Sequence, residues 1–109
     1  YELIECMEKD SKIKISEIKV DGGMVNNSSF LQSLSDVTQI KIIKPKIIET
    51  TSLGAAFLAG LQSGIIKDIN DIKKLWEKKS EVKPNIKKSI AEINIKKWKN
   101  IIKKVNNFY

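Results

Sequence analysis

The run IKVDGGMVNNSSFLQSLSDVTQIKIIKP, residues 18–45, decides the fold of this chain. Apolar residues fall at nearly every second position up to Val20, and Asp21, Gly22 and Gly23 then interrupt the pattern. An alternating apolar run that stops at a glycine pair predicts a strand at about residues 17–21, followed by a tight turn.

A helix of about residues 27–37 should follow the turn, because NNSS offers several side-chain caps for the unpaired amides of a first helical turn. Its inward stripe should comprise Phe30, Leu31, Leu34 and Val37. The run TQIKIIKP then predicts a second strand at about residues 39–44, ended by Pro45. The short connection favours a parallel crossover, so we expect an α/β fold with two main parallel-type strands.

Further helices are predicted on both sides of this unit, because apolar residues recur there at helical spacing. They are expected at residues 1–9, and within residues 47–65 with Thr50, Thr51 or Ser52 as cap and Gly64 as the stop. Two more are expected at residues 69–76 with Asp68 or Asn70 as cap, and at residues 86–107 with a break near Asn94. The stretch EKKSEVKPN, residues 77–85, reads as a polar connector. The helix within residues 47–65 is unusually rich in glycine and alanine, which lets another backbone or a ligand come close.

A strand that ends in a glycine pair and leads into a helix places backbone N–H groups where an anion or a nucleotide can approach. The stretch is neither a GxGxxG fingerprint nor a P-loop, because the third glycine and the GK[ST] run are missing. From spacing alone, a plain tight turn and a nucleotide contact both remain open.

The length of 109 residues suits one domain, and the net charge of +7 is carried mainly by lysines after residue 66. A basic chain raises the possibility of nucleic acid, but the sequence contains no arginine, the commonest side chain that reads guanine. The lysine-rich segment is therefore interpreted as a solvated helix face, and nucleic acid is not the expected partner.

Several other site classes are not expected from the composition. No apolar run approaches the length of a membrane span and no signal-peptide pattern is present, which indicates a cytoplasmic protein without a membrane partner. Cys6 is the one cysteine and histidine is absent, so neither an internal disulfide nor a zinc site is expected. Cys6 is predicted to be a buried or half-buried helix residue.

The central residues resemble the C-terminal part of the FGGY family of carbohydrate kinases, and of its glycerol-phosphorylating members in particular. The shared pattern is a strand ending in DGG, an Asn four residues after the second Gly, a helix, a strand reaching Pro, and E-x-T-x-LGAA-x-LAG. The matching positions are Asp21, Gly22, Gly23, Asn27, Gln32, Asp36, Pro45, Glu49, Thr51, Leu53, Gly54, Ala55, Ala56, Leu58, Ala59 and Gly60. Ser28 and Ser52 depart from it.

The resemblance implies part of an actin-like, ribonuclease-H-like ATPase domain. Residues 1–66 would form its strand and helix nucleotide-binding part, and residues 67–109 a lysine-rich helical tail. By position, Gly22 and Gly23 would line ATP or ADP and Asn27 would hydrogen-bond the adenine, whereas Asp21 would support the turn or the site. Glycine permits close backbone approach, and a carboxamide can both donate and accept.

The resemblance also implies what lies outside this chain. Phosphoryl transfer needs Mg²⁺ ligands, phosphate-binding groups and a catalytic carboxylate. The family places these, and its glycerol contacts, in segments that precede the matched region. We therefore expect a fragment of a longer kinase, partnered by the rest of that polypeptide, with no catalytic residue and no activity of its own. An exposed strand edge would also allow a homo-oligomer.

Two alternatives stay open at this point. The chain could be a non-catalytic remnant that binds a nucleotide or another chain, or a basic nucleic-acid-binding module.

Overall fold

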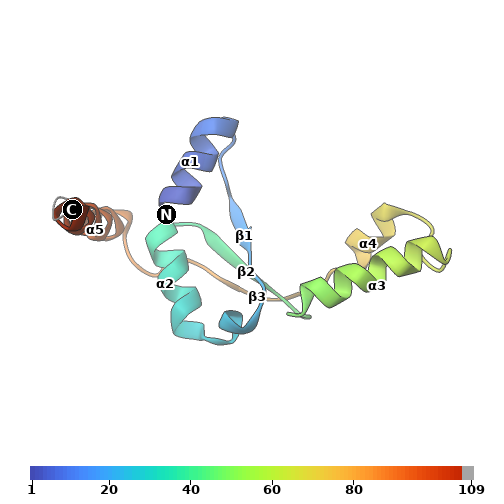
Figure 1. Cartoon of the computed structure of the whole chain (residues 1–109). Helices are drawn as coiled ribbons and strands as arrows, with labels where there is room; N and C mark the ends of the chain where they lie inside the picture. Colours follow the sequence, from blue (N-terminus) through green and yellow to red (C-terminus); the bar gives the residue numbers. More distant parts are fainter. Residues whose placement is uncertain (107–109) are drawn as a thin grey trace.

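The computed structural model describes residues 1–106. Its elements, in chain order, are α1 (Glu2–Ser11), β1 (Glu17–Lys19), a 3₁₀ turn (Gly23–Asn26), α2 (Ser28–Thr38), β2 (Lys41–Pro45), α3 (Thr50–Gln62), α4 (Ile69–Leu75), β3 (Lys78–Val82) and α5 (Lys88–Asn106). Figure 1 shows the strands at the centre, with α5 on one side and the α3–α4 pair on the other. The helices and two strands expected from the sequence are present, and the fold is α/β.

The sheet has three strands in the order β1–β2–β3. β1 and β2 are parallel, with Ile18 opposite Ile42, and α2 makes the crossover between them as predicted. β2 and β3 are antiparallel, with Ile42 opposite Val82. The prediction of a polar connector at residues 77–85 was therefore wrong over β3. The run KKSEV lacks apolar alternation because β3 is an edge strand with mostly exposed side chains, a place where charged residues are favoured.

The core lies between α2 and the sheet. Val25, Leu31 and Ile42 form its centre, and Ile18, Val20, Leu34, Ile48 and Val82 pack around them. Ser35 is fully buried, but its hydroxyl donates to the carbonyl oxygen of Ile40 at 2.8 Å, so its burial leaves no polar group unsatisfied. Phe30, which was expected in the inward stripe, is 40% exposed because the buried side of α2 is formed by Leu31, Ser35 and Thr38, and Phe30 lies a quarter-turn or more around the helix from Leu31.

The helix α5 is continuous over the described residues, so the predicted break near Asn94 is wrong. Asparagine lowers helix stability by no more than about 0.7 kcal/mol against alanine. The three- and four-residue spacing of Ala91, Ile95, Trp98 and Ile102 runs past Asn94 without a change of register, so the helix keeps one apolar side. The predicted end of this helix, residue 107, lies outside the described residues.

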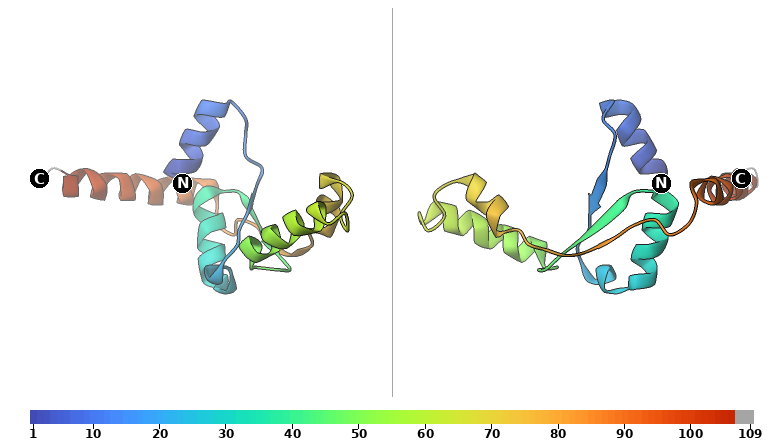
Figure 2. Two further views of the ribbon diagram at one scale, coloured as in Figure 1. Left: turned by 45° about the vertical axis from the view of Figure 1, so that its right-hand side comes forward. Right: turned by 180° about the vertical axis from the view of Figure 1, so that it is seen from behind.

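The molecule is extended rather than round. Its radius of gyration is 18.0 Å and its extents are 56 × 31 × 28 Å, whereas a compact domain of about 100 residues has a radius of gyration near 13 Å. Residues 46–77, which include α3 and α4, form an arm that leaves the sheet after β2 and returns to it at β3 (Figure 2). We call these residues the arm. No residue of α3 or α4 is buried.

None of the helices within residues 1–106 combines the length and the apolar composition that crossing a bilayer requires. Cys6 is exposed on α1, contrary to the prediction that it is buried or half-buried. The reason is that the more shielded side of α1, at Ile4 and Glu8, is itself only half-buried, and Cys6 lies on the other side of the helix.

Candidate functional site

The candidate site is the turn that follows β1. Gly22 has φ +79° and ψ 179°, a backbone conformation that is essentially restricted to glycine. Its carbonyl oxygen accepts from the backbone N–H of Val25 at 3.2 Å, which closes the turn and starts the 3₁₀ segment. Glycine at this position is therefore required by the shape of the turn itself.

The turn is tied to the chain between β2 and α3. The backbone N–H of Gly22 donates to the carbonyl oxygen of Ile48 at 3.2 Å, and the hydroxyl of Thr50 donates to the carboxylate of Asp21. Thr50 is the first residue of α3. The aspartate thus holds the glycine turn against the beginning of the arm, while its role toward a ligand stays a prediction.

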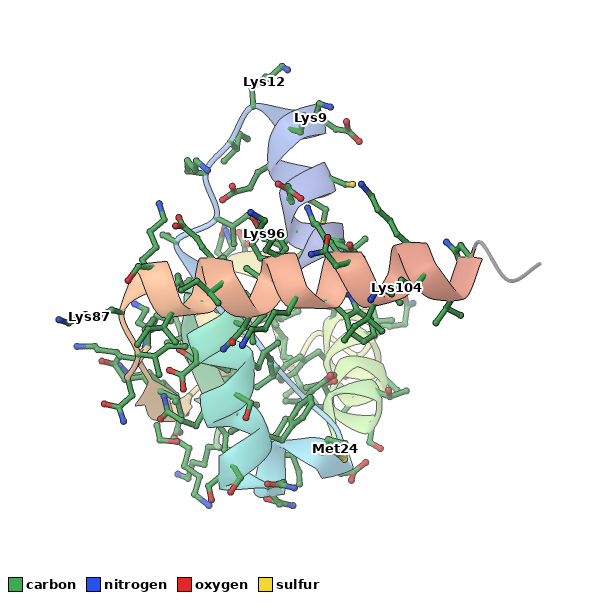
Figure 3. The ribbon with its side chains drawn as sticks, turned by 90° about the vertical axis from the view of Figure 1, so that its left-hand side faces the viewer. Lys9, Lys12, Met24, Lys87, Lys96 and Lys104 are labelled. Atoms are coloured by element: carbon green, nitrogen blue, oxygen red, sulfur yellow. The ribbon has the colours of Figure 1, made fainter. Side chains whose placement is uncertain are left out.

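The glycine pair has open space in front of it. A Cβ atom built on Gly22 or Gly23 would meet no heavy atom within 4 Å. Met24, next along the turn and labelled in Figure 3, is 57% exposed. The chain therefore presents bare backbone over this stretch, and bare backbone allows a planar or extended ligand to lie within van der Waals distance.

Asn27 is the N-cap of α2. Its Oδ1 accepts from the backbone N–H of Phe30 at 3.0 Å, and its φ and ψ of −87° and 102° are extended, as a cap requires. This arrangement confirms that the NNSS run caps the helix, and it selects Asn27 among the four candidates. The Nδ2 amino group of Asn27 has no hydrogen-bond partner within residues 1–106, so it is the group left to donate to a ligand.

The four predicted site residues, Asp21, Gly22, Gly23 and Asn27, thus belong to one continuous turn and cap. Two further residues at the turn were not predicted: Thr50, which bonds Asp21, and Lys44, whose ammonium donates to Asn26 Oδ1 at 2.9 Å. Lys44 lies on β2, whose end meets the end of β1 in a parallel pair. The parallel crossover was the signal that could have placed it there, because it brings both carboxyl ends to one edge of the sheet.

Gln32 and Asp36, two further positions of the family pattern, do not belong to the turn. The Nε2 group of Gln32 donates to Asp36 Oδ1 and to the carbonyl oxygen of Lys83, each at 3.0 Å, and the backbone N–H of Asn85 donates to the same Oδ1 at 2.6 Å. The Asn85 N–H, followed by the Gln32 amide, holds the pKa of Asp36 below its ordinary value. This group, which we call the Asp36 clamp, fastens the segment between β3 and α5 to α2.

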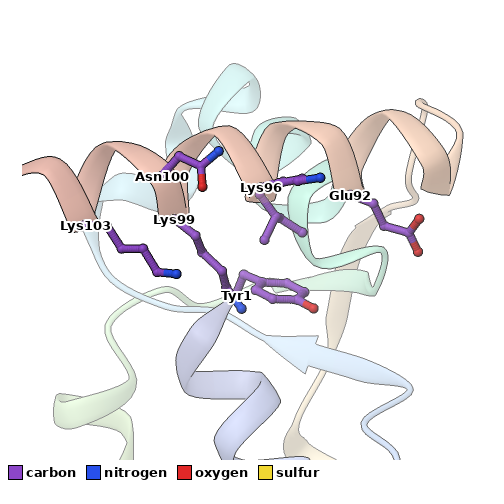
Figure 4. Close-up of a pocket in the computed structure, with 7 residues that line it drawn as sticks. Tyr1, Glu92, Lys96, Lys99, Asn100 and Lys103 are labelled. Atoms are coloured by element: carbon purple, nitrogen blue, oxygen red, sulfur yellow. The ribbon is translucent and has the colours of Figure 1, made fainter.

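Within residues 1–106, no three His, Cys, Asp or Glu side chains gather in a way that could hold a metal ion. A hollow of about 400 Å³ lies beside α5 and is lined by Tyr1, Glu92, Ile95, Lys96, Lys99, Asn100 and Lys103 (Figure 4). None of these residues belongs to the turn, so this hollow is a feature separate from the candidate site.

Comparison with known proteins identifies the family of the chain. Residues 1–63, which contain the turn, match the model of the FGGY family of carbohydrate kinases, C-terminal domain. Glycerol kinase 2 of Streptomyces avermitilis is 36% identical over 103 residues, and the glycerol kinase of Deinococcus radiodurans is 35% identical over 107 residues. These alignments cover 94% and 98% of this chain.

The fold also matches a solved structure, that of Plasmodium falciparum glycerol kinase with ADP, with a TM-score of 0.82 and 28% identity. The match covers 94% of this chain and 21% of that one. The present chain likewise spans only 20% and 21% of the length of the two bacterial relatives.

Proposed function

Because this chain belongs to the FGGY family of carbohydrate kinases, we propose that it is the C-terminal fragment of an ATP-dependent glycerol kinase and that it supplies the adenosine side of the nucleotide site. The reaction would transfer the γ-phosphoryl group of ATP to glycerol, in the cytoplasm. The observation that carries the proposal is the turn of residues 21–27, where two glycines face open space and lead directly to a free amino group on Asn27.

The chemistry of the turn suits a purine nucleoside. Backbone without side chains at Gly22 and Gly23 would let the sugar or the base lie close to the chain. The Asn27 Nδ2 group would donate to a ring nitrogen of the base, since its Oδ1 is already engaged by the helix cap. Asp21 and Thr50 would keep the turn in place by bonding to each other, and we assign them no contact with the nucleotide.

The remaining parts of a kinase would come from the rest of the polypeptide. Phosphoryl transfer needs Mg²⁺ and a carboxylate that accepts the hydroxyl proton, and residues 1–106 hold no group of side chains suited to a metal. We therefore assign no catalytic step to this chain. The apolar α3, which has no buried residue, would be covered by the rest of the kinase.

Isothermal calorimetry with ADP tests the nucleotide site. Asn27→Ala should weaken binding by about 1–2 kcal/mol, because it removes the donated hydrogen bond. Asn27→Ser is the matched variant, because serine also caps a helix but lacks the amino group. It should lose the same affinity while keeping the thermal stability of the wild type. Equal affinity of all three proteins would refute the contact.

A complementation assay tests the fragment role. The D. radiodurans relative would be truncated so that it lacks the region matched here, and ADP formation with glycerol would be followed after adding this chain. Activity is expected only from the mixture. Glycerol phosphorylation by this chain alone would show that the assignment of the catalytic groups to other segments is wrong.

A further inference from the structure

The last helix, α5, separates its side chains into two faces. Lys88, Glu92, Lys96, Lys99 and Lys103 follow one another at three- and four-residue spacing on one side. A neighbouring side carries Ala91, Ile95, Trp98, Ile101, Ile102 and Val105, with Ile95 at its border beside the lysines. The helix contains six lysines and a single glutamate, so its polar face is strongly cationic.

The apolar side of α5 is fully buried only at its beginning, whereas Ile95 and Ile102 are half-buried. Ala91 is 1% exposed, and the adjoining segment is fastened to α2 by the Asp36 clamp. Farther along, Trp98, Ile101 and Val105 are 53%, 54% and 50% exposed. Figure 2 shows why: the second half of α5 projects beyond the rest of the molecule. We call Trp98, Ile101, Ile102 and Val105 the α5 stripe.

The lysines around the stripe are largely available to an external anion. Lys99 pairs with Glu5 at 3.2 Å, and Lys88 is 4.0 Å from Glu92. Lys96, Lys97, Lys103 and Lys104 form no ion pair within the described part of the chain. Figure 3 shows Lys96 and Lys104 along the helix, and Lys97 and Lys104 stand one turn before and one turn after Ile101.

We propose that α5 binds the surface of an anionic lipid bilayer, lying in the plane of the headgroups with the α5 stripe in the acyl boundary. A helix with low overall hydrophobicity, lysines on one face, and tryptophan with aliphatic residues on the other is the pattern of an interfacial helix. The lysine stems reach the headgroups while their ammonium groups stay in water. The lack of a spanning helix does not bear on this mode, because the helix lies on the bilayer and does not cross it.

A nucleic acid fits the same helix less well. It would neutralise the lysines but leave the α5 stripe in water, and the chain has no arginine to read bases or clamp phosphates. An anionic bilayer would both neutralise the lysines and remove the α5 stripe from water. No residue of the nucleotide turn takes part, so failure of the bilayer test would leave the nucleotide proposal standing.

The fluorescence emission of Trp98 reports binding to the bilayer. In the full chain carrying Trp76→Phe, Trp98 is the one tryptophan left, and its emission would be titrated with vesicles of 30% phosphatidylglycerol in phosphatidylcholine. A shift to shorter wavelength is expected, with partitioning roughly tenfold or more stronger than into pure phosphatidylcholine. Raising the salt concentration should reduce this preference.

Two variants in the same background separate the two faces of the helix. Ile101→Ser should abolish the emission shift, whereas Ile69→Ser, at a more exposed position on α4 (67% against 54%), should leave it unchanged. Lys97→Gln combined with Lys104→Gln should reduce the preference for anionic vesicles. An unshifted Trp98 emission, equal partitioning into both vesicle types, or tighter binding to a short DNA duplex than to the vesicles would overturn the proposal.

Discussion

The helices α2 and α3 have similar lengths, 11 and 13 residues, but opposite relations to the rest of the molecule. α2 is amphipathic and buries Leu31, Ser35 and Thr38 against the sheet. α3 is the more apolar of the two, but none of its residues is fully buried, and Leu53, Phe57 and Leu61 are only half-buried. A helix that is apolar all round is stable in water only when other elements enclose it. The contrast teaches that this chain carries a complete local core around α2 and an unfinished one around α3.

The largest expected effect tests that contrast directly. Ile42→Ala should lower the free energy of unfolding by about 3 kcal/mol. Ile42 is fully buried between α2 and the sheet, so the truncation leaves a cavity. Leu58 on α3 is 69% exposed, so Leu58→Ala should stay within about 0.5 kcal/mol. Urea unfolding followed by circular dichroism gives both values. Comparable losses would mean that α3 is packed in solution.

The beginnings of the two helices should also respond differently. Asn27→Ala removes the cap of α2 and should cost about 1 kcal/mol, whereas Asn27→Ser should restore most of that loss. The corresponding position of α3 is Glu49, so the expectation that Thr50, Thr51 or Ser52 caps this helix is wrong, and the Glu49 side chain forms no cap hydrogen bond. Glu49→Ala is therefore the matched control and should leave the urea midpoint near that of the wild type. A loss at Glu49 as large as that at Asn27 would contradict the assignment of the caps.

Replacing glycines inside α3 with alanine should have a smaller effect, and this effect should stabilise the chain. A Cβ atom at Gly54 would meet nothing within 4 Å, so Gly54→Ala should stabilise the isolated chain by about 0.5–1 kcal/mol through its higher helix propensity. At Gly60 a Cβ atom would approach Ile66 Cδ1 to 2.8 Å, so Gly60→Ala should gain less. Thermal unfolding of both variants decides the point. A destabilised Gly54→Ala would indicate that another surface already packs on α3.

The smallest expected effect concerns the far end of α2 and depends on pH. The pKa of Asp36 is lowered in the folded chain, first by the Asn85 N–H. The stability that the ionised Asp36 carboxylate gives the folded chain is therefore complete above the unfolded pKa of about 3.9. This stability is lost as the pH falls through the lower pKa of the folded chain. The difference in urea midpoint between wild type and Asp36→Ala should shrink below about pH 4. Asp10→Ala, at an exposed position on α1, is the control; a difference that stays constant down to low pH would argue against the clamp.

The sequence predicted the β1–α2–β2 unit because each of its signals agreed: alternation before Asp21, a cap at Asn27 and a stop at Pro45. The cap of α4 was also left between two residues, and the structure assigns it to Asp68, whose side chain accepts from the N–H of Asn70. The kinase family was predicted from the DGG and LGAA positions, and the family comparison confirms it.

Other features could not be predicted because they depend on residues far apart in the chain. β3 forms through its register with β2, some forty positions earlier, and its own residues carry no strand pattern. The break expected near Asn94 rested on an apparent shift of the apolar register between Ile93 and Trp98, but Ala91, Ile95 and Trp98 keep one register through a continuous helix. The nucleotide roles of Gly22, Gly23 and Asn27 stay predictions, since the bonds that define the turn explain its shape and leave its ligand to experiment.

The antiparallel pairing of β2 with β3 has a consequence for the architecture of the arm. The backbone N–H of Lys46 donates to the carbonyl oxygen of Glu77 at 2.9 Å, so the two ends of the arm meet as the two ends of a hairpin loop do. In the sheet, residues 46–77 are therefore the loop that connects β2 to β3. The arm is therefore a long hairpin loop whose first residues are also built into the rest of the molecule, because Ile48 packs around the core and Thr50 bonds Asp21.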